Sequence, residues 1–391
     1  MRYRFGACEL IPETRELAVD GSPRPVEPQV FDLLLFVVKE RARVVTQDEL
    51  IGAVWGGRIV SDSAVAARIS AARSAIGDDG ARQERIRTIR GRGFRFVGEV
   101  EEIAAAPQGI AAVGRQRIAF CRSADGTGIG YAISGDGYPL VKVGNWLTHL
   151  EHDWASPIWQ PFLGRLGKSF RLLRYDQRGN GLSDWTVGDF SPDRFVEDLE
   201  AVVAAAGLDR FALYGASQGV PIGIAYAARH PERVSHLILH GGYEQGRLVR
   251  GTASEREQGS AILTLIRHGW GKRDSAFIKA FAAMFIPDGS GEQVDSLADL
   301  QRLTTSPENA AALRHAIDHF DVSGILGQVR TPTLVVHARN DAIQPFDQGR
   351  RIAAGIAGAE FLQLDSGNHV ILPQEKAWPV LFDAIERFVG R

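Results

Sequence analysis

The run Phe211-Ala-Leu-Tyr-Gly215-Ala-Ser217-Gln-Gly219 joins an apolar, strand-like segment to a helical one through a Gly-x-Ser-x-Gly turn. A turn of this kind holds the serine hydroxyl on strained backbone above the end of the strand, and its glycines let neighbouring backbone pack closely. The pattern alone is weak in a chain that contains 43 glycines, so the surrounding sequence must decide. We expect Ser217 to be a nucleophile if a base and an acid accompany it.

The surrounding sequence alternates apolar strands with helices. Helical stretches such as 193–206 and 220–229 separate most of the strands. This alternation predicts an α/β fold with a mainly parallel, doubly wound sheet that helices cover on both faces. The expected strands are 140–143, 170–175, 211–214, 234–239, 333–337 and 361–364.

Two later strand ends supply the partners that a nucleophilic serine needs. A base must take the hydroxyl proton, and an acid must fix the tautomer of that base. Asp341 follows one strand in VVHARNDAIQPF, and His369 follows the next in LQLDSGNHVILP. A further strand is followed by Asp176-Gln-Arg-Gly-Asn-Gly-Leu-Ser183. Ser217, Asp341 and His369 are therefore the candidate catalytic residues.

Together these motifs resemble the α/β-hydrolase fold superfamily over essentially all of residues 117–391. The resemblance implies Ser217 as nucleophile, His369 as general base and Asp341 as the acid that orients it. It also implies an oxyanion hole formed by the backbone N–H of Gln218 and a second N–H from Asn145 or Trp146. We prefer Trp146, although the family's usual His-Gly pair is missing here.

The resemblance further implies a mostly helical lid at about 243–327 over an apolar pocket. We expect four aromatic residues of the lid to line this pocket: Trp270, Phe277, Phe281 and Phe285. An alternative is that the hydrolase fold is retained only to bind a ligand and does not catalyse its hydrolysis.

Residues 1–100 show a different pattern. A helix is expected from about Pro28 to Glu40, and a capping box at Thr46-Gln-Asp-Glu49 begins a second one that continues to Trp55. A third helix is expected from Ser61 or Asp62 to Gly77, and the arginine-rich run 86–97 is expected to form a hairpin around Gly91-Arg-Gly93. Helices followed by a basic hairpin are typical of proteins that dock on DNA.

This segment resembles the winged-helix output domain of OmpR/PhoB-type transcription regulators, an α+β fold. The resemblance implies that the third helix and the hairpin, or wing, contact DNA. The helix face opposite its apolar stripe carries mainly Ser and Ala, so direct base readout is expected to be thin. The candidate DNA-binding residues are Arg68, Ser70, Arg73, Arg87, Arg90 and Arg92.

A segment of short side chains with Pro107 and two glycines separates the two patterns. We therefore expect a winged-helix domain at 1–100, a linker at 101–116 and the hydrolase-like domain at 117–391.

Overall composition narrows the class of protein. The charges nearly balance, with 45 Lys+Arg against 47 Asp+Glu, which excludes a uniformly basic nucleic-acid coat. Two cysteines cannot form a disulfide framework or a cysteine zinc site. No signal peptide and no membrane-spanning apolar run is visible, so a cytoplasmic protein is expected. No phosphate loop or dinucleotide fingerprint is present, so we expect no cofactor.

Two groups of polar residues leave alternatives open. His315 and His319 have the i, i+4 spacing of metal ligands, but without a third ligand we expect no metal site. His149, Glu151, His152 and Asp153 are expected in a loop near the substrate, where they either bind a ligand or are simply solvated.

The leading hypothesis is a one-component transcription regulator, in which a DNA-binding domain is joined to a ligand-binding domain and no phospho-receiver domain is expected.

 Its hydrolase-like domain would bind, and could hydrolyse, a small apolar ester or lactone, and the chain is expected to act as a homodimer on DNA. A second hypothesis is a serine hydrolase whose winged helix serves for tethering or dimerisation. A third is a sensor whose Ser217 site is catalytically silent.

Overall fold

The computed structural model describes residues 2–12, 15–55, 60–103, 116–272 and 275–390. The chain divides into two compact units, Met1–Gly109 and Ile110–Arg391. Within the described residues, no helix combines the length and apolarity that crossing a bilayer requires.

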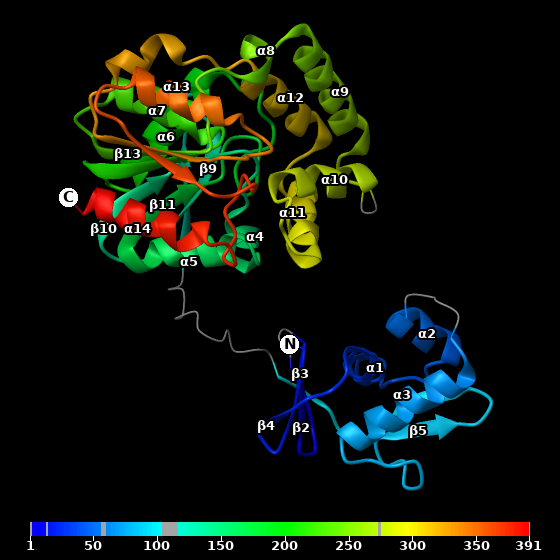
Figure 1. Ribbon diagram of the computed structural model, residues 1–391. Coiled ribbons are helices and arrows are strands. Elements are labelled where there is room, and N and C mark those ends of the chain that lie inside the picture. Colours follow the sequence, from blue (N-terminus) through cyan, green and yellow to red (C-terminus); the bar gives the residue numbers. More distant parts are fainter. Residues whose placement is uncertain (1, 13–14, 56–59, 104–115, 273–274, 391) are drawn as a thin grey trace. The chain divides into compact units, whose positions relative to one another are not determined.

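The first unit joins a small antiparallel sheet to three helices and a hairpin (Figure 1). The sheet has the order β4-β3-β2-β1-β7. Its strands are β1 (Arg2–Phe5), β2 (Cys8–Ile11), β3 (Glu16–Val19), β4 (Ser22–Arg24) and β7 (Glu101–Ile103). The helices are α1 (Pro28–Lys39), α2 (Gln47–Trp55) and α3 (Asp62–Ala75), and the hairpin pairs β5 (Ile86–Ile89) with β6 (Gly93–Phe96).

Local sequence signals explain the helix starts in this unit. The backbone N–H of Thr46 donates to Glu49 Oε2 at 2.8 Å, and the N–H of Glu49 donates back to Thr46 Oγ1 at 3.3 Å, which is the expected capping box. Ser61 caps α3 by accepting the N–H of Ala64. The apolar stripe of α3 is buried as expected at Val65, Ile69, Ala72 and Ile76.

One boundary differs from expectation. Residues 101–103, expected as the start of the linker, form β7 and pair with β1. The pairing of Arg4 with Glu101 places a basic side chain beside an acidic one, and their charged groups lie 3.5 Å apart. The rest of the expected linker, apart from Gln116, lies outside the described residues.

The second unit is built on an eight-stranded sheet with the order β15-β14-β13-β12-β10-β11-β9-β8. The six strands from β10 to β15 are parallel, and the antiparallel β9 and β8 extend the sheet beyond β11. Their bounds are β8 (Arg117–Arg122), β9 (Gly128–Ser134), β10 (Tyr138–Lys142), β11 (Phe170–Tyr175), β12 (Phe211–Ala216), β13 (Val234–His240), β14 (Thr333–Ala338) and β15 (Glu360–Leu364).

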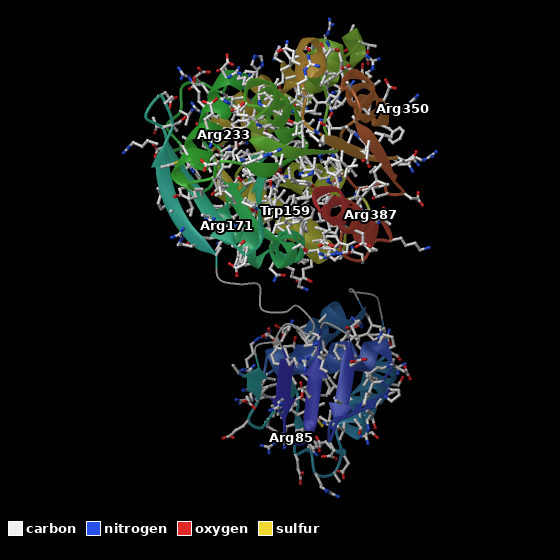
Figure 2. All side chains as sticks on the ribbon, turned by 90° about the vertical axis from the view of Figure 1, so that its left-hand side faces the viewer. Arg85, Trp159, Arg171, Arg233, Arg350 and Arg387 are labelled. Carbon is white, nitrogen blue, oxygen red and sulfur yellow. The ribbon has the colours of Figure 1, made fainter. Side chains whose placement is uncertain are left out.

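Helices cover both faces of this sheet, as the alternating pattern predicts (Figure 1). One face carries α6 (Pro192–Ala205), α7 (Gly219–Arg229) and α13 (Phe346–Gly355). The other carries α5 (Trp159–Ser169) and α14 (Ala377–Val389), and the short α4 (Leu150–Ala155) packs on α5. Figure 2 shows Trp159 in the interior of the unit, whereas Arg350 and Arg387 lie at its surface.

The chain between β13 and β14 forms a helical lid, as expected. Figure 1 shows most of these helices gathered beside one end of the sheet. They are α8 (Arg247–Arg250), α9 (Ala253–Gly269), α10 (Ala276–Phe285), α11 (Gly291–Thr304) and α12 (Pro307–Asp318), followed by the 3-10 helix η1 (Ser323–Gln328).

Candidate active site and nucleic-acid interface

Ser217 occupies the sharp turn between β12 and α7. Its φ of 51° lies in the left-handed region, which is strained for a residue with a side chain. Its backbone N–H donates to the carbonyl of His240 at 2.9 Å, which ties the turn to the neighbouring strand. A Cβ at Gly215 would lie 2.5 Å from the carbonyl oxygen of Gly219, so only glycine fits there. The spacing of the motif therefore follows from the tightness of the turn.

His369 and Asp341 form a buried pair beside this turn. His369 Nδ1 lies 2.8 Å from Asp341 Oδ2, and it donates to that ionised carboxylate. The other oxygen, Oδ1, accepts the backbone N–H groups of Ile343 and Gln344 at 2.8 and 2.9 Å. These contacts fix the carboxylate, which in turn leaves His369 Nε2 free to act as a base.

The electrostatics of Asp341 favour its charged form. Burial by itself raises the pKa of the carboxyl, but the charge and hydrogen bond of His369 and the two backbone N–H groups outweigh burial. The pKa of Asp341 therefore lies below its ordinary value. A carboxylate that stays ionised stabilises the imidazolium that forms when His369 accepts a proton.

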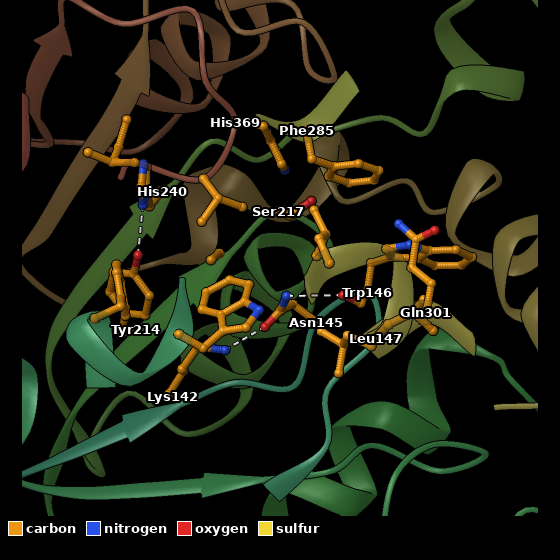
Figure 3. A pocket seen from close by; sticks show the side chains of 17 residues that line it. Lys142, Asn145, Trp146, Leu147, Tyr214, Ser217, His240, Phe285, Gln301 and His369 are labelled. Atoms are coloured by element: carbon orange, nitrogen blue, oxygen red, sulfur yellow. Dashed lines mark hydrogen bonds between the residues drawn. The ribbon is translucent and has the colours of Figure 1, made fainter. Parts of the chain in front are cut away.

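Ser217 and His369 line one cavity under the lid (Figure 3). The structure records no hydrogen bond between the two side chains, a common state of catalytic groups without substrate. The wall is largely apolar, and its residues are Lys142, Asn145, Trp146, Leu147, Trp159, Phe162, Tyr214, Ala216, Ser217, His240, Phe285, Leu297, Leu300, Gln301, His369, Val370 and Ile371.

The two expected oxyanion-hole residues flank this cavity. Gln218 directly precedes α7 as its N-cap residue, and its side-chain amide donates to Gln177 Oε1 at 2.9 Å. Trp146 follows β10 and lines the cavity, and the next residue, Leu147, is held at a φ of 50°. Among the described residues, neither the Gln218 nor the Trp146 backbone N–H has a protein acceptor. Both N–H groups are therefore available to a ligand oxygen.

The Asp176–Ser183 run does not line the cavity, and its contacts instead fix a neighbouring loop. Arg178 is fully buried and binds Asp198 through two hydrogen bonds of 2.8 and 2.6 Å. Asp176 Oδ2 accepts the backbone N–H groups of Leu150 and Leu182 at 3.0 and 2.9 Å. These contacts fix the loop after β11, which lies next to β10 in the sheet.

The expectation for the lid aromatics is only partly correct. Phe285 lines the cavity, and its ring centroid lies 5.8 Å from that of His369. Trp270 and Phe281 instead pack edge-on against Trp146, with ring centroids 5.9 and 6.3 Å away, and Phe277 stacks on Phe281. Trp270 and Phe281 therefore pack against a residue that lines the cavity, Trp146, and do not line it themselves.

The polar segment after β10 is a helix rather than the expected loop. His149 caps α4 by accepting the N–H groups of Glu151 and His152, and none of the three lines the cavity. Asp153 is buried, and its Oδ2 lies 3.2 Å from Arg174 Nη1. His149 and Asp153 therefore have structural partners within the protein.

His315 lies in the last turn of α12 and His319 directly follows that helix; their ring centroids are 4.4 Å apart, and His319 Nδ1 lies 2.7 Å from the carbonyl of His315. The part of the chain that the structure describes contains no group of three His, Cys, Asp or Glu residues arranged to hold a metal ion.

In the first unit, two of the expected DNA-contacting arginines are engaged within the protein. Arg73 is buried, and its guanidinium donates to the carbonyl of Ile86 and to Thr88 Oγ1 at 2.7 to 2.9 Å. Arg73 therefore attaches α3 to the wing and cannot reach DNA. Arg68 pairs with Glu27 and donates to Gln29 Oε1 at 3.2 Å, so it is held against the start of α1.

The other four candidates are exposed. Ser70 lies on the outer face of α3, among the small side chains expected there, and Arg87, Arg90 and Arg92 are exposed on and around the β5–β6 turn. The spacing of the apolar residues correctly predicts which face of α3 is exposed. It could not predict that Arg73 folds back, because a guanidinium reaches several ångströms away from its own helix position.

Lys142 is a cavity residue that the sequence patterns did not single out. It is the last residue of β10, its side chain is buried, and it lines the same cavity as Ser217. The signal was a charged residue in an otherwise apolar strand (LVKV) of a sheet that is covered on both faces. Charged side chains are rarely buried without a reason.

Comparison with known proteins agrees with both halves of this description. A family model described as the alpha/beta hydrolase fold matches residues 147–376. A second model, described as the C-terminal part of transcriptional regulatory proteins, matches residues 21–96.

Similar sequences come from hydrolases. The 2-hydroxymuconate semialdehyde hydrolase of a Pseudomonas species is 30% identical over 280 residues, which cover 65% of this chain and 87% of that enzyme. The protein of Rhizobium rhizogenes named "Putative carbamate hydrolase RutD" is 30% identical over 234 residues, covering 56% of this chain and 85% of that protein.

Solved structures show the same fold at lower identity. The enol-lactonase of Burkholderia xenovorans superimposes with a TM-score of 0.56 at 23% identity, covering 70% of this chain and 100% of that one. The esterase RhEst1 of a Rhodococcus species gives 0.55 at 24% identity, with 70% and 98% covered. The chain thus belongs to the α/β-hydrolase family and carries, ahead of that fold, an OmpR/PhoB-type DNA-binding domain.

Proposed function

We propose that this chain is a DNA-binding transcription regulator whose hydrolase unit binds and hydrolyses a small ester or lactone. One observation carries the proposal: Ser217 on its strained turn and His369, which Asp341 orients, line one cavity in a chain that also has an exposed, arginine-rich wing. A fold alone would not support hydrolysis, because function depends on the site.

In the proposed reaction, His369 Nε2 takes the hydroxyl proton as Ser217 Oγ attacks the ligand's carbonyl carbon. The carbonyl oxygen becomes an oxyanion, which the free N–H groups of Gln218 and Trp146 stabilise. The bond to the leaving alkoxide then breaks, and the imidazolium returns its proton to that oxygen. Water, deprotonated by His369, cleaves the acyl-enzyme and releases the acid.

The proposed DNA interface comprises Ser70 on α3 and the exposed arginines of the wing. Arg87, Arg90 and Arg92 are placed to contact phosphates, which position a protein on DNA without reading its sequence. We propose that the regulator acts as a homodimer, because two copies of a weakly reading helix would gain specificity from the spacing of their half-sites.

A second candidate function is a serine hydrolase that uses its first unit for tethering or dimerisation. The observation in its favour is the exposed face of α3, where small side chains predominate and both arginines of the helix have protein partners. The exposed arginines of the wing favour the regulator.

Assays of ester hydrolysis and of DNA binding test the two parts of the proposed function separately. We expect the full chain to hydrolyse p-nitrophenyl butyrate, and Ser217→Ala to lose on the order of 10⁶ in rate, down to the background, with an unchanged circular dichroism spectrum. Activity that survives Ser217→Ala would exclude this mechanism.

For DNA, the native promoter fragment is titrated at several salt concentrations. We expect Arg90→Ala with Arg92→Ala to weaken binding to all sequences and to flatten the slope of log K against log salt by about one to two units. Absence of binding by the unaltered chain would favour the tethered hydrolase, and a loss confined to the specific operator would show that the wing reads bases.

A further inference from the structure

Lys142 brings a positive charge into a cavity that is otherwise largely apolar. Only 5% of the residue is exposed, and Nζ donates to Asn145 Oδ1 at 2.5 Å (Figure 3). An ammonium group has three protons to donate. Asn145 Oδ1 is the one hydrogen-bond acceptor that the described residues offer it, so two protons remain without a partner.

Two buried acids, Asp153 and Asp176, act on the ammonium only through their charge at longer range. Asp153 pairs with Arg174, and Asp176 accepts two backbone N–H groups. Within the described part of the chain, no carboxylate lies within 4.0 Å of the Lys142 ammonium. Burial lowers the pKa of Lys142, and the charges of Asp153 and Asp176 offset that effect only in part. Ammonium protons that are buried without an acceptor are costly, and an anion supplied by a ligand would accept them.

Other unpartnered donors surround the same cavity. The indole Nε1 atoms of Trp146 and Trp159 are buried and have no acceptor. The Lys142 ammonium lies over the Trp159 ring, 5.5 Å from its centre, in a cation–π contact that leaves its protons without a further acceptor atom. Gln301 Oε1, on the lid, is an acceptor without a partner. Near Lys142, then, the cavity offers donors to a ligand that brings acceptors.

We propose that the ligand carries a free carboxylate, which binds the Lys142 ammonium while the ligand's ester or lactone carbonyl lies at Ser217. This inference rests on the proposed function, since it assumes that the ligand occupies the Ser217 cavity. A charge-assisted hydrogen bond in a site of low dielectric is strong, so it selects against an uncharged ligand of the same shape. Lys142 is thereby a specificity-determining residue, and the ligand class narrows to short half-esters and lactone acids.

Two ligands of equal shape and different charge test this proposal. Monomethyl glutarate ends in a carboxylate, and methyl 4-carbamoylbutanoate replaces that group with an uncharged amide. Each is titrated by calorimetry into the full chain carrying Ser217→Ala, so that neither is consumed. We expect the carboxylate to bind about 30-fold more tightly or better, in line with the coupling of buried charge pairs.

Substitution of the lysine locates the source of the preference. Lys142→Met in the same background should abolish the preference for the carboxylate, whereas Lys168→Met, which removes an exposed charge from α5, should retain it. A role confined to positioning Asn145 would weaken both ligands equally, and that result overturns the proposal. If Lys142→Met does not fold, the Ser217→Ala chain alone tests the proposal, because equal binding of the two ligands to that chain would also contradict it.

The outcomes separate this inference from the proposed function. Turnover of p-nitrophenyl butyrate without a carboxylate preference would reject the inference and leave hydrolysis standing. A carboxylate preference without any turnover would keep the inference and reject hydrolysis. Failure of both ligands to bind overturns the inference whatever the turnover.

Discussion

His240 makes the hydrolase unit sensitive to acid. This residue ends β13 beside the cavity, it is buried, and its Nδ1 lies 2.7 Å from the Tyr214 hydroxyl. Burial, reinforced by the neighbouring His369 and His337, lowers the pKa of His240 from 6.5 to about 3. The imidazole therefore stays neutral in the folded protein under conditions that charge it in the unfolded chain.

The sign of the effect follows from proton counting. Between pH 6.5 and about 3, the unfolded chain binds a proton at His240 that the folded chain does not bind, so acid favours unfolding. The contribution of His240 to the free energy of unfolding is complete above pH 6.5 and falls as the pH drops through that value. Between pH 7 and pH 5 the free energy of unfolding falls by about 2 kcal/mol, because each full pH unit below 6.5 costs about 1.4 kcal/mol.

Urea unfolding at pH 7 and pH 5 measures this loss. Six of the seven tryptophans lie in the hydrolase unit, so tryptophan fluorescence follows that unit. His240→Asn retains an acceptor for the Tyr214 hydroxyl and cannot titrate, so we expect its unfolding free energy to fall by about 2 kcal/mol less than that of the unaltered chain. An equal fall in both proteins would refute the assignment of this acid sensitivity to His240.

Two further predictions follow from packing. Gly215→Ala places a Cβ 2.5 Å from the Gly219 carbonyl, so the turn must shift, and we expect ester hydrolysis by the folded variant to fall about 100-fold; steady-state rates equal to those of the unaltered chain would contradict this. Arg73→Met removes the donors to the Ile86 carbonyl and should destabilise the first unit by about 2–3 kcal/mol, with an unchanged salt slope of DNA binding; thermal unfolding and a salt titration check both parts.

The sequence predicted the central sheet well because parallel strands that are buried on both faces are continuous apolar runs. Strand 170–175 has the expected bounds, and 234–239 is extended only by His240. The antiparallel β8 and β9 are absent from the expected strands. The strand β8 has only four apolar residues between two arginines, and Gly130 interrupts β9, so neither has a long apolar run.

The site was predictable in its backbone and less so in its side chains. The order of Ser217, Asp341 and His369 along the chain depends on where strands end, and periodicity locates strand ends. The partners of Lys142 and Arg73 depend instead on how long side chains lie in three dimensions. Spacing along the sequence does not carry that information, so a buried lysine and a buried arginine had to be found in the structure.

A regulator that its ligand controls must bind DNA differently when the Ser217 cavity is filled. Operator affinity of the full chain is measured by fluorescence anisotropy before and after a serine-directed phosphonate has modified Ser217 completely, as judged by mass spectrometry. A ligand can alter DNA affinity only by favouring one of two arrangements of the chain, so we predict a change of about 5- to 150-fold, and no change in the Ser217→Ala chain given the same treatment. An identical dissociation constant with Ser217 fully modified would contradict the account.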